Sequence, residues 1–412
     1  MERVAIVGGL RTPFVKAHTS FSKHSMQQLA EHVLRELVKK YEIDPGAIDE
    51  VVLGAVLLDP TTPNWAREIV LRAGLPKTVY AHSVSNNCIS GLVAINGAKD
   101  RIALGMTKIA IAGGTESMSN PALLFSKKKS KLFLKLFTAK SVAEKLSILS
   151  KNPFQLFPTP PSVKEPSTGL TMGEHMEITA KQLGIGRREQ DEIALKSHLN
   201  AWNATEKGYF SSEIAPLDGV KTDLMIRKDT SLEKLSRLSP VFDTSGKGSL
   251  TAGNSSPLTD GASMVLLMSE SQAKAEGREI LAFIRSYEYA AIDANDGLLM
   301  APAVCVPKML HRVGLTLADF DLIEIHEAFA AQVLANCKAW EEGLMAQSIG
   351  KVDSSKVNTL GGSISIGHPF AATGGRIVTS LANEMKRRGV KRGLISICAA
   401  GAMAGAMILE RD

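Results

Sequence analysis

Apolar residues along the chain follow two alternating patterns. Short, nearly continuous apolar runs have the length and composition of buried strands, and the stretches between them repeat apolar residues every three to four positions, as amphipathic helices do. The same rhythm returns late in the chain. This alternation predicts βαβ units in a layered α/β fold. The strand-like runs are 4–9, 51–57, 108–114, 320–329, 356–362 and 393–401, and the expected helices are 26–41, 90–104, a segment ending near 342, and 371–388.

The two halves of the chain share a layout that suggests a duplication. Cys88 precedes the helix 90–104 and His368 precedes the helix 371–388, and each helix leads into a strand that ends in small residues. The longest uncharged apolar stretch, 394–409, is shorter than the roughly 20 residues of a membrane helix and contains glycine. It predicts two buried strands joined by a tight turn.

The middle of the chain, residues 117–250, is less regular and predicts an inserted loop domain. Residues 121–165 hold nine lysines and two glutamates, a local charge of +7 in a chain of net charge +6, and the segment 127–151 carries most of it. Helical spacing over 131–149 predicts a basic amphipathic helix with lysines away from its apolar face. That face comprises Leu132, Leu136, Ala139, Ala143 and Leu146.

The composition narrows the class of protein. A chain of 412 residues is longer than the roughly 250–300 residues that one core supports, so two or three lobes are expected. Hydrophobic residues at 44% and charged residues at 22% exclude a largely disordered or fibrous chain, and aromatic residues at 5% indicate no stacking platform for nucleic acid. Four cysteines without a CxxC pair favour free thiols in a reducing compartment. The start, MERVAIVGG, lacks a signal-peptide pattern, so we expect no cleaved leader.

Four residues stand in settings that suit chemistry. Cys88, in NNCISG, opens a helix, where free amides and the helix dipole favour a thiolate, although a lone cysteine is also explained as a small buried hydrophobe. His368 lies between a glycine and a proline at a helix start, which presents a ring to a pocket or caps the helix. Cys398 ends a strand beside small residues, where a lone cysteine would be a core residue. His326 follows the strand FDLIEI, where a lone histidine is equally explained as structural.

Together these segments resemble the thiolase family. The resemblance covers essentially the whole chain, and the order and spacing of its motifs are specific. The motifs are GLRTPF (9–14), NNCISG (86–91), AGGTESMS (112–119), TAGNSSPLTDGAS (251–263), HEAF (326–329), GGSISIGHP (361–369) and CAAGAMAG (398–405).

The resemblance implies a fold and a division of the chain. The fold is α/β, with two duplicated βαβαβαββ halves in a five-layered α-β-α-β-α arrangement and an inserted loop domain. The N-terminal half would comprise residues 1–116 and 251–275, the loop domain 117–250 and the C-terminal half 276–412.

Carried over residue by residue, the resemblance also implies roles. Cys88 would be the acylated nucleophile, His368 the base that activates it and a donor to the thioester oxygen, and Cys398 the acid and base for the acetyl α-carbon. His326 stands where many thiolases have an asparagine that holds an oxyanion-hole water. This substitution is similar to the trifunctional-enzyme β-subunit branch.

Two further positions carry weaker implications. The backbone amides of Cys88 and Ala400 would form a second oxyanion hole, although the family pattern Cys-x-Gly is Cys-Ala-Ala-Gly here. Ser256 resembles a serine near the pantetheine arm of CoA, and a loop serine that caps its own backbone explains it almost as well.

The implied activity is that of a 3-ketoacyl-CoA thiolase of fatty-acid β-oxidation, with CoA as a substrate and neither metal nor redox cofactor. The implied partners are a second copy of the chain and an enoyl-CoA hydratase/3-hydroxyacyl-CoA dehydrogenase α subunit in an α2β2 assembly. The segment 127–151 resembles an insertion implicated in membrane association, which implies a cytoplasmic protein peripheral to a membrane surface. A solvated helix packed on its own loop domain is the alternative, and nucleic acid is not an expected partner.

Two other functions remain open. A biosynthetic acetoacetyl-CoA thiolase would use the same residues in the condensing direction. A non-catalytic acyl-CoA-binding scaffold would share the fold, but the presence of Cys88, His368 and Cys398 argues against it. A ketoacyl synthase normally has a histidine where this chain has Cys398, so the cysteine favours a thiolase.

Overall fold

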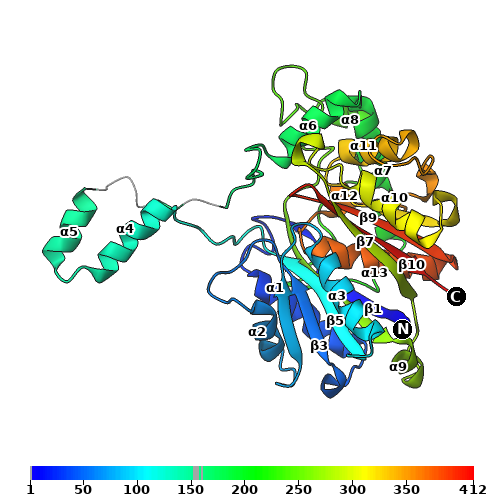
Figure 1. Cartoon of the computed structure of the whole chain (residues 1–412), viewed down its shortest axis with the longest axis horizontal. Coiled ribbons are helices and arrows are strands. Elements are labelled where there is room, and N and C mark those ends of the chain that lie inside the picture. The colour runs from blue at the N-terminus through cyan, green and yellow to red at the C-terminus, as the bar shows by residue number, and fades with distance from the viewer. Residues whose placement is uncertain (1, 152–156, 159–160) are drawn as a thin grey trace.

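The computed structural model describes residues 2–151, 157–158 and 161–412 (Figure 1). The described strands are β1 (Val4–Arg11), β2 (Val15–Lys16), β3 (Glu50–Gly54), β4 (Tyr80–Val84), β5 (Ile109–Glu116), β6 (Thr259–Ser269), β7 (Ala282–Ala291), β8 (Leu322–Ile325), β9 (Arg392–Ala399) and β10 (Met403–Glu410). The helices are α1 (Met26–Lys40), α2 (Trp65–Arg72), α3 (Ser90–Ala103), α4 (Lys127–Thr138), α5 (Val142–Ser150), α6 (Met172–Gln182), α7 (Arg187–Glu206), α8 (Leu232–Ser236), α9 (Glu270–Ala275), α10 (Pro302–Val313), α11 (Ala330–Glu342), α12 (Ser363–Ile366) and α13 (Ala372–Arg388).

The strands form one mixed sheet that divides into two halves. Its order is β4-β3-β5-β6-β1-β7-β10-β9-β8, with β2 beside β6. The first half contains parallel strands β4, β3 and β5, the second contains parallel strands β8 and β9, and the remaining pairs are antiparallel. The halves meet at β1 and β7, which pair at Ala5–Phe283 and Ile6–Ala282.

Helices cover the sheet on both sides and fill the space between its halves. The first core cluster lies between α1, α2 and the first-half strands, the second surrounds α3 and α13 between the halves, and the third lies between the second-half strands and α10 and α11. The layers therefore follow the order α-β-α-β-α, as expected.

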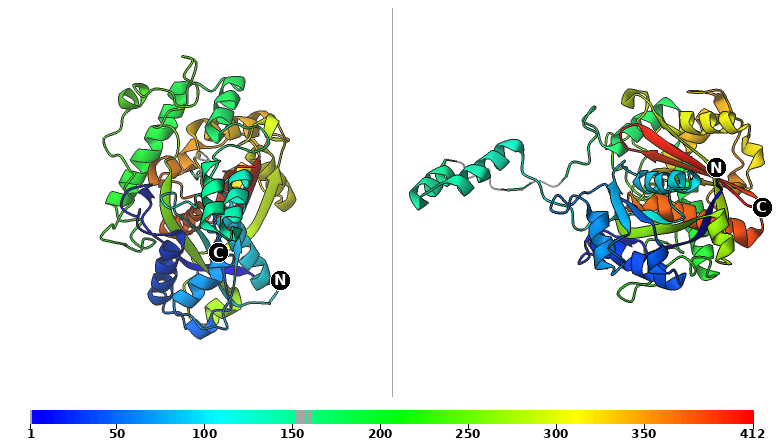
Figure 2. Two further views of the ribbon diagram at one scale, coloured as in Figure 1. Left: turned by 90° about the vertical axis from the view of Figure 1, so that its left-hand side faces the viewer. Right: turned by 60° about the horizontal axis from the view of Figure 1, so that its bottom comes forward.

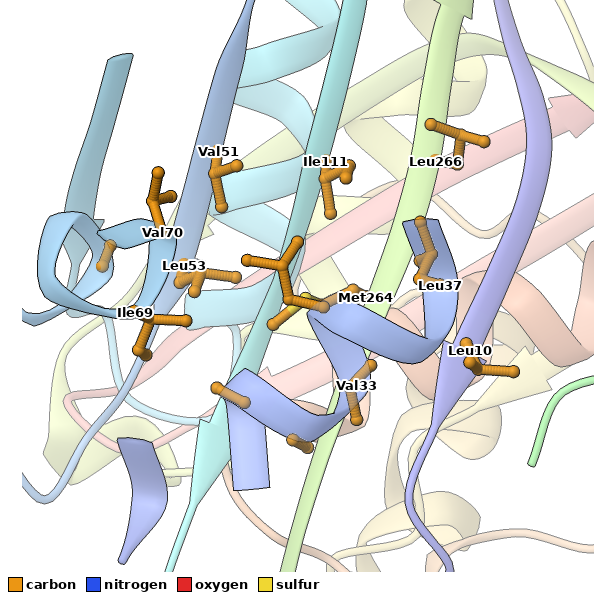
Figure 3. Close-up of a cluster of buried hydrophobic side chains, with 14 of the residues drawn as sticks. Leu10, Val33, Leu37, Val51, Leu53, Ile69, Val70, Ile111, Met264 and Leu266 are labelled. Carbon is orange, nitrogen blue, oxygen red and sulfur yellow. The ribbon is translucent and has the colours of Figure 1, made fainter. Parts of the chain in front are cut away.

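Helix α1 illustrates how the sequence specifies these layers. Ser25 and Gln28 form a capping box at its start, since each side chain accepts a hydrogen bond from the other residue's backbone amide. Leu29, Val33 and Leu37 repeat at four-residue intervals and are fully buried. Figure 3 shows Val33 and Leu37 over the strands of the first half, in the same cluster as residues of α2, β3, β5 and β6.

Most predicted elements are confirmed, and one strand-like run is wrong. Lys356 ends a 3-10 turn (Ser354–Lys356), Val357 makes a single bridge to Ile323, and residues 358–362 form no strand because Asn358 has a positive φ of 47° that ends extended backbone. The stretch 394–409 forms β9, a tight turn and β10, as predicted. None of the described helices is both long and apolar enough to cross a membrane.

The basic segment differs from the single helix that its spacing predicted. It forms two helices, α4 and α5, because Ala139 is extended and Ser141 caps α5 by accepting from the amide of Glu144. The predicted apolar face is therefore interrupted: Leu132 is buried, but Leu146 is 61% exposed. Figures 1 and 2 show this helical arm projecting from the body. The parts of the predicted loop domain at 152–156 and 159–160 lie outside the described residues.

Glycines allow α3 and α13, the two helices between the halves of the sheet, to pack with their backbones in contact. A Cβ on Gly91 of α3 or on Gly114 of β5 would overlap the carbonyl oxygen of Ala371, which precedes α13. A Cβ on Gly374 of α13 would lie 2.6 Å from the amide nitrogen of Leu92. Gly91 lies three residues after Cys88, and Ala371 lies three residues after His368. The contact between them therefore sets the distance between the two segments that carry Cys88 and His368.

We predict opposite effects for two Gly→Ala substitutions in α3. Gly91→Ala overpacks the contact with Ala371 and should lower the free energy of unfolding by about 1–3 kcal/mol. Gly97→Ala meets no atom within 4 Å and should leave stability unchanged or raise it by up to about 1 kcal/mol through helix propensity. Urea unfolding of both variants measures the difference, and equal stabilities would show that the contact is not close.

Candidate active site

The central helices bring residues from both halves to one place. Cys88 lies just before α3, His368 just before α13, Cys398 near the end of β9, and His326 directly after β8. The rings of His326 and His368 have centroids 4.1 Å apart. The backbone amide of Ala400 faces the Cys88 sulfur and lowers the pKa of its thiol, and Cys88 in turn raises the pKa of Cys398. The structure thus groups Cys88 with Cys398 and Ala400, and His326 with His368, and the contact of Gly91 with Ala371 joins the two groups.

Asn87 orients the segment around Cys88. It has a φ of 48°, a left-handed conformation that asparagine tolerates better than most residues. Its side-chain nitrogen donates to the carbonyl oxygen of Ala400 at 2.9 Å. This bond holds the turn after β9 so that the Ala400 amide reaches the Cys88 sulfur.

Cys88 is protonated in the unoccupied protein, contrary to the expectation from its place at a helix start. Burial raises the pKa of its thiol to about 12, and the hydrogen bonds from the amides of Ala400 and Cys88 offset only part of that effect. The amides at the helix start favour a thiolate, but the desolvation of the buried sulfur outweighs them. Cys88 therefore needs a base to become a nucleophile.

His368 has the charge state and tautomer of that base. Burial, followed by the charge of Arg376, lowers its pKa to about 3, so the ring is neutral near pH 7. Its Nδ1 lies 2.7 Å from the hydroxyl of Thr373, which donates to the carbonyl of Pro369 at 3.5 Å. Because that hydroxyl proton is already used, Nδ1 is assigned as the N–H donor and Nε2 keeps a lone pair for a proton.

Cys398 and His326 complete the cluster as neutral groups. Burial, followed by the neighbouring Cys88, raises the pKa of Cys398 well above its usual value, so this thiol can supply a proton. Burial, followed by His368 and Arg376, lowers the pKa of His326 well below its usual value. The Nδ1 of His326 contacts Ser363, whereas its buried Nε2 has no hydrogen-bond partner among the described residues. A ligand in the site would find this nitrogen unoccupied.

Comparison with known proteins identifies the family of the chain. The family model "Thiolase, N-terminal domain" matches residues 4–271, and "Thiolase, C-terminal domain" matches residues 278–411. The chain belongs to the thiolase family.

Similar proteins extend over nearly the whole chain. It is 44% identical to a 3-ketoacyl-CoA thiolase of Vibrio cholerae, over 99% of this chain and 97% of the relative, and 42% identical to one of Colwellia psychrerythraea, over 100% and 98%. It also resembles the crystal structure of the Bacillus anthracis acetyl-CoA acetyltransferase, with a TM-score of 0.85 and 35% identity. The human mitochondrial 3-ketoacyl-CoA thiolase gives a TM-score of 0.84 at 28% identity, and both alignments cover 100% of this chain and 99% of the other.

Ser256 is less well defined in this thiolase. Its backbone amide donates to the carbonyl of Ala328 at 2.9 Å, so the loop that carries it runs alongside the HEAF segment near His326. The loop-capping alternative describes its neighbour instead, since the hydroxyl of Ser255 donates to the carbonyl of Thr251 at 2.7 Å. Ser256 lies near the site, and among the described residues its hydroxyl makes no hydrogen bond that assigns it a role.

Sequence reasoning missed Glu116 as part of this site. Its carboxylate accepts from the amides of Leu57 at 2.8 Å, Val56 at 3.1 Å and Ala371 at 3.4 Å, and burial raises its pKa to about 7. It joins the end of β5, the loop after β3 and the start of α13. Its place in AGGTESMS was the available signal, but nothing in that motif names the three amides.

Proposed function

We propose that this thiolase is a 3-ketoacyl-CoA thiolase, an acetyl-CoA C-acyltransferase of fatty-acid β-oxidation. It would cleave a 3-ketoacyl-CoA with CoA into acetyl-CoA and a shortened acyl-CoA. The proposal is supported by two neighbouring buried thiols, Cys88 and Cys398, and a neutral imidazole, His368, in a chain so similar to bacterial 3-ketoacyl-CoA thiolases.

The first half-reaction moves two protons, one from Cys88 to His368 and one from Cys398 to the substrate. His368 Nε2 takes the proton of the Cys88 thiol, and the thiolate attacks the 3-keto carbon. The bond between C2 and C3 breaks, and its electron pair remains on C2 as the enolate of acetyl-CoA. The thiol of Cys398 protonates C2. This leaves an acyl thioester on Cys88, an imidazolium at His368 and a thiolate at Cys398.

The second half-reaction restores the starting state. The Cys398 thiolate takes the proton of incoming CoA, and the CoA thiolate attacks the acyl carbonyl. The amides of Cys88 and Ala400, which both reach the Cys88 sulfur, would stabilise the tetrahedral oxyanion. Acyl-CoA leaves, and the released Cys88 thiolate recovers its proton from His368.

Mass spectrometry tests the covalent step. After incubation with a long-chain 3-ketoacyl-CoA in the absence of free CoA, the protein should carry one acyl group on Cys88, and Cys88→Ala should carry none. Thiolysis by Cys88→Ala should fall by at least about 10³-fold, since the nucleophile is lost. Cys337→Ala is the matched control, because Cys337 is a half-buried thiol of α11 outside the site, and it should keep both adduct and activity.

The outcomes separate the alternatives. A parent protein that takes no acyl group would favour the acyl-CoA-binding scaffold. Thiolysis confined to acetoacetyl-CoA would favour a biosynthetic enzyme, and the similar Bacillus anthracis structure is that of an acetyl-CoA acetyltransferase.

A homodimer is the assembly that we propose, with an α subunit of hydratase and dehydrogenase activity completing an α2β2 complex. β4 supports the dimer, because it pairs with β3 on one edge and, in the described residues, with no strand on the other. Tyr80 on this strand is 55% exposed. Sedimentation equilibrium checks the dimer, and a monomer mass at micromolar concentration would contradict it.

We also propose that the helical arm, residues 127–151, contacts an anionic membrane surface and leaves this thiolase peripheral to the membrane in the cytoplasm. The arm carries eight lysines and one glutamate, and several large apolar side chains on it face solvent. These include Leu134 at 63%, Phe137 at 84%, Val142 at 72% and Leu146 at 61% exposed. Exposed apolar surface flanked by lysine suits the headgroup region of a bilayer.

Vesicle flotation tests the arm. The parent protein should float with vesicles of anionic phospholipid, and a variant without residues 127–151 should not. A second variant, Leu134→Ser with Phe137→Ser, keeps every lysine and should float only at low salt, because charge attraction alone is screened. Equal flotation of the parent and the deletion would contradict the proposal.

A further inference from the structure

The charge state of His326 raises the question of which ring nitrogen holds its proton. A buried neutral imidazole has one N–H, so its two nitrogens play opposite roles, one as a donor and one as an acceptor. Only a donor can stabilise negative charge on a reacting carbonyl oxygen, directly or through a water. The tautomer therefore decides whether His326 assists or opposes the reaction.

The environment of Nδ1 determines that tautomer. Nδ1 lies 2.9 Å from the hydroxyl oxygen of Ser363, and Nη2 of Arg376 donates to the same oxygen at 3.2 Å. His326, Ser363 and Arg376 are all buried, with at most 1% of each residue exposed. The three side chains form a hydrogen-bonded chain that is buried away from solvent.

The hydrogen bonds that link Arg376, Ser363 and His326 have one favourable arrangement of their protons. A guanidinium group only donates, so Ser363 cannot pass its hydroxyl proton to Arg376. Among the described residues, the remaining partner of that hydroxyl is Nδ1 of His326. If Nδ1 carried the proton instead, the Ser363 hydroxyl would be buried without an acceptor, which native proteins rarely allow. The favoured order runs from Arg376 to Ser363 to Nδ1.

We propose that Arg376 and Ser363 are positioning residues that place the single proton of His326 on Nε2 and so make this nitrogen a donor to the carbonyl oxygen of the substrate. The inference rests on the proposed function for the identity of that substrate. The Nε2 of His326 agrees with it, since this buried nitrogen has no hydrogen-bond partner in the part of the chain that the structure describes and is available to a ligand oxygen or its bridging water.

Arg376 has a second effect on the same ring. Its Nη1 lies 3.9 Å from Glu324, a carboxyl whose pKa burial raises to about 8. Burial is the largest cause of the lowered pKa of both His326 and His368, and the positive charge of Arg376 lowers both further. The neighbouring histidines thus stay neutral, as a donor and a base require.

Ser365 provides a matched control on the same short helix. Ser363 and Ser365 both belong to α12, and both are fully buried. The hydroxyl of Ser365 bonds Ser197 at 2.9 Å and the carbonyl of Gly362 at 3.0 Å, and makes no contact with His326. Replacing either serine with alanine removes a hydroxyl group, but only Ser363→Ala removes a hydrogen bond to His326.

Nitrogen NMR of the full protein labelled with ¹⁵N-histidine reads the tautomer directly. The signals of His326 are identified by their absence in His326→Asn. In the parent, Nε2 should give a protonated-type shift and Nδ1 an unprotonated-type shift. Ser363→Ala should move both shifts toward averaged values and lower kcat/KM by about tenfold with the KM for CoA unchanged, whereas Ser363→Thr should restore both and Ser365→Ala should change neither.

The parent spectrum alone can overturn the proposal, even if Ser363→Ala does not fold. A protonated Nδ1 in the parent contradicts it, and so does an unchanged Nε2–H in folded Ser363→Ala. These results are independent of acylation at Cys88, which tests the proposed function separately. A normal Cys88 adduct together with a protonated Nδ1 of His326 would contradict the proposed roles of Arg376 and Ser363 and would still support the thiolase mechanism.

Discussion

The close approach of α3 and α13 is the contact on which the rest of this structure depends. Each helix follows a reactive residue from a different half of the chain, Cys88 in one case and His368 in the other. Gly91, Gly114 and Gly374 remove the side chains that would otherwise separate the backbones. The gap between two distant sequence segments is thereby fixed by main-chain contact, which varies less than contacts between flexible side chains.

Burial at this contact also sets the chemistry. Removal from water raises the pKa of Cys88 and Cys398 and lowers that of His368 and His326, so the resting site consists of neutral thiols and neutral rings. Protons can pass among such groups without leaving unpaired buried charges before substrate arrives. The amides near Cys88 and Ala400 then act on charge that forms only during the reaction.

The sequence predicted the layers better than the surroundings of the candidate residues. Hydrophobic period is a local signal that located β1, α1, α3 and α13, and the resemblance of the motifs singled out Cys88, His368 and Cys398. The partners of those residues are set by tertiary contact: no local pattern shows that Thr373 fixes the ring of His368 or that Ser363 lies between a ring and Arg376. The single helix expected over 131–149 failed because the cap formed by Ser141 outweighed a continuous apolar period.

The central claim is that the two halves place a protonated Cys88 beside a neutral base. It is tested most directly by the rate at which iodoacetamide alkylates Cys88 in substrate-free protein, followed on the Cys88 peptide by mass spectrometry as pH is raised. Because burial raises the pKa of the thiol to about 12, the rate should keep increasing with pH up to at least about pH 9. A plateau below about pH 7 would reveal a resting thiolate paired with an imidazolium and would contradict the account.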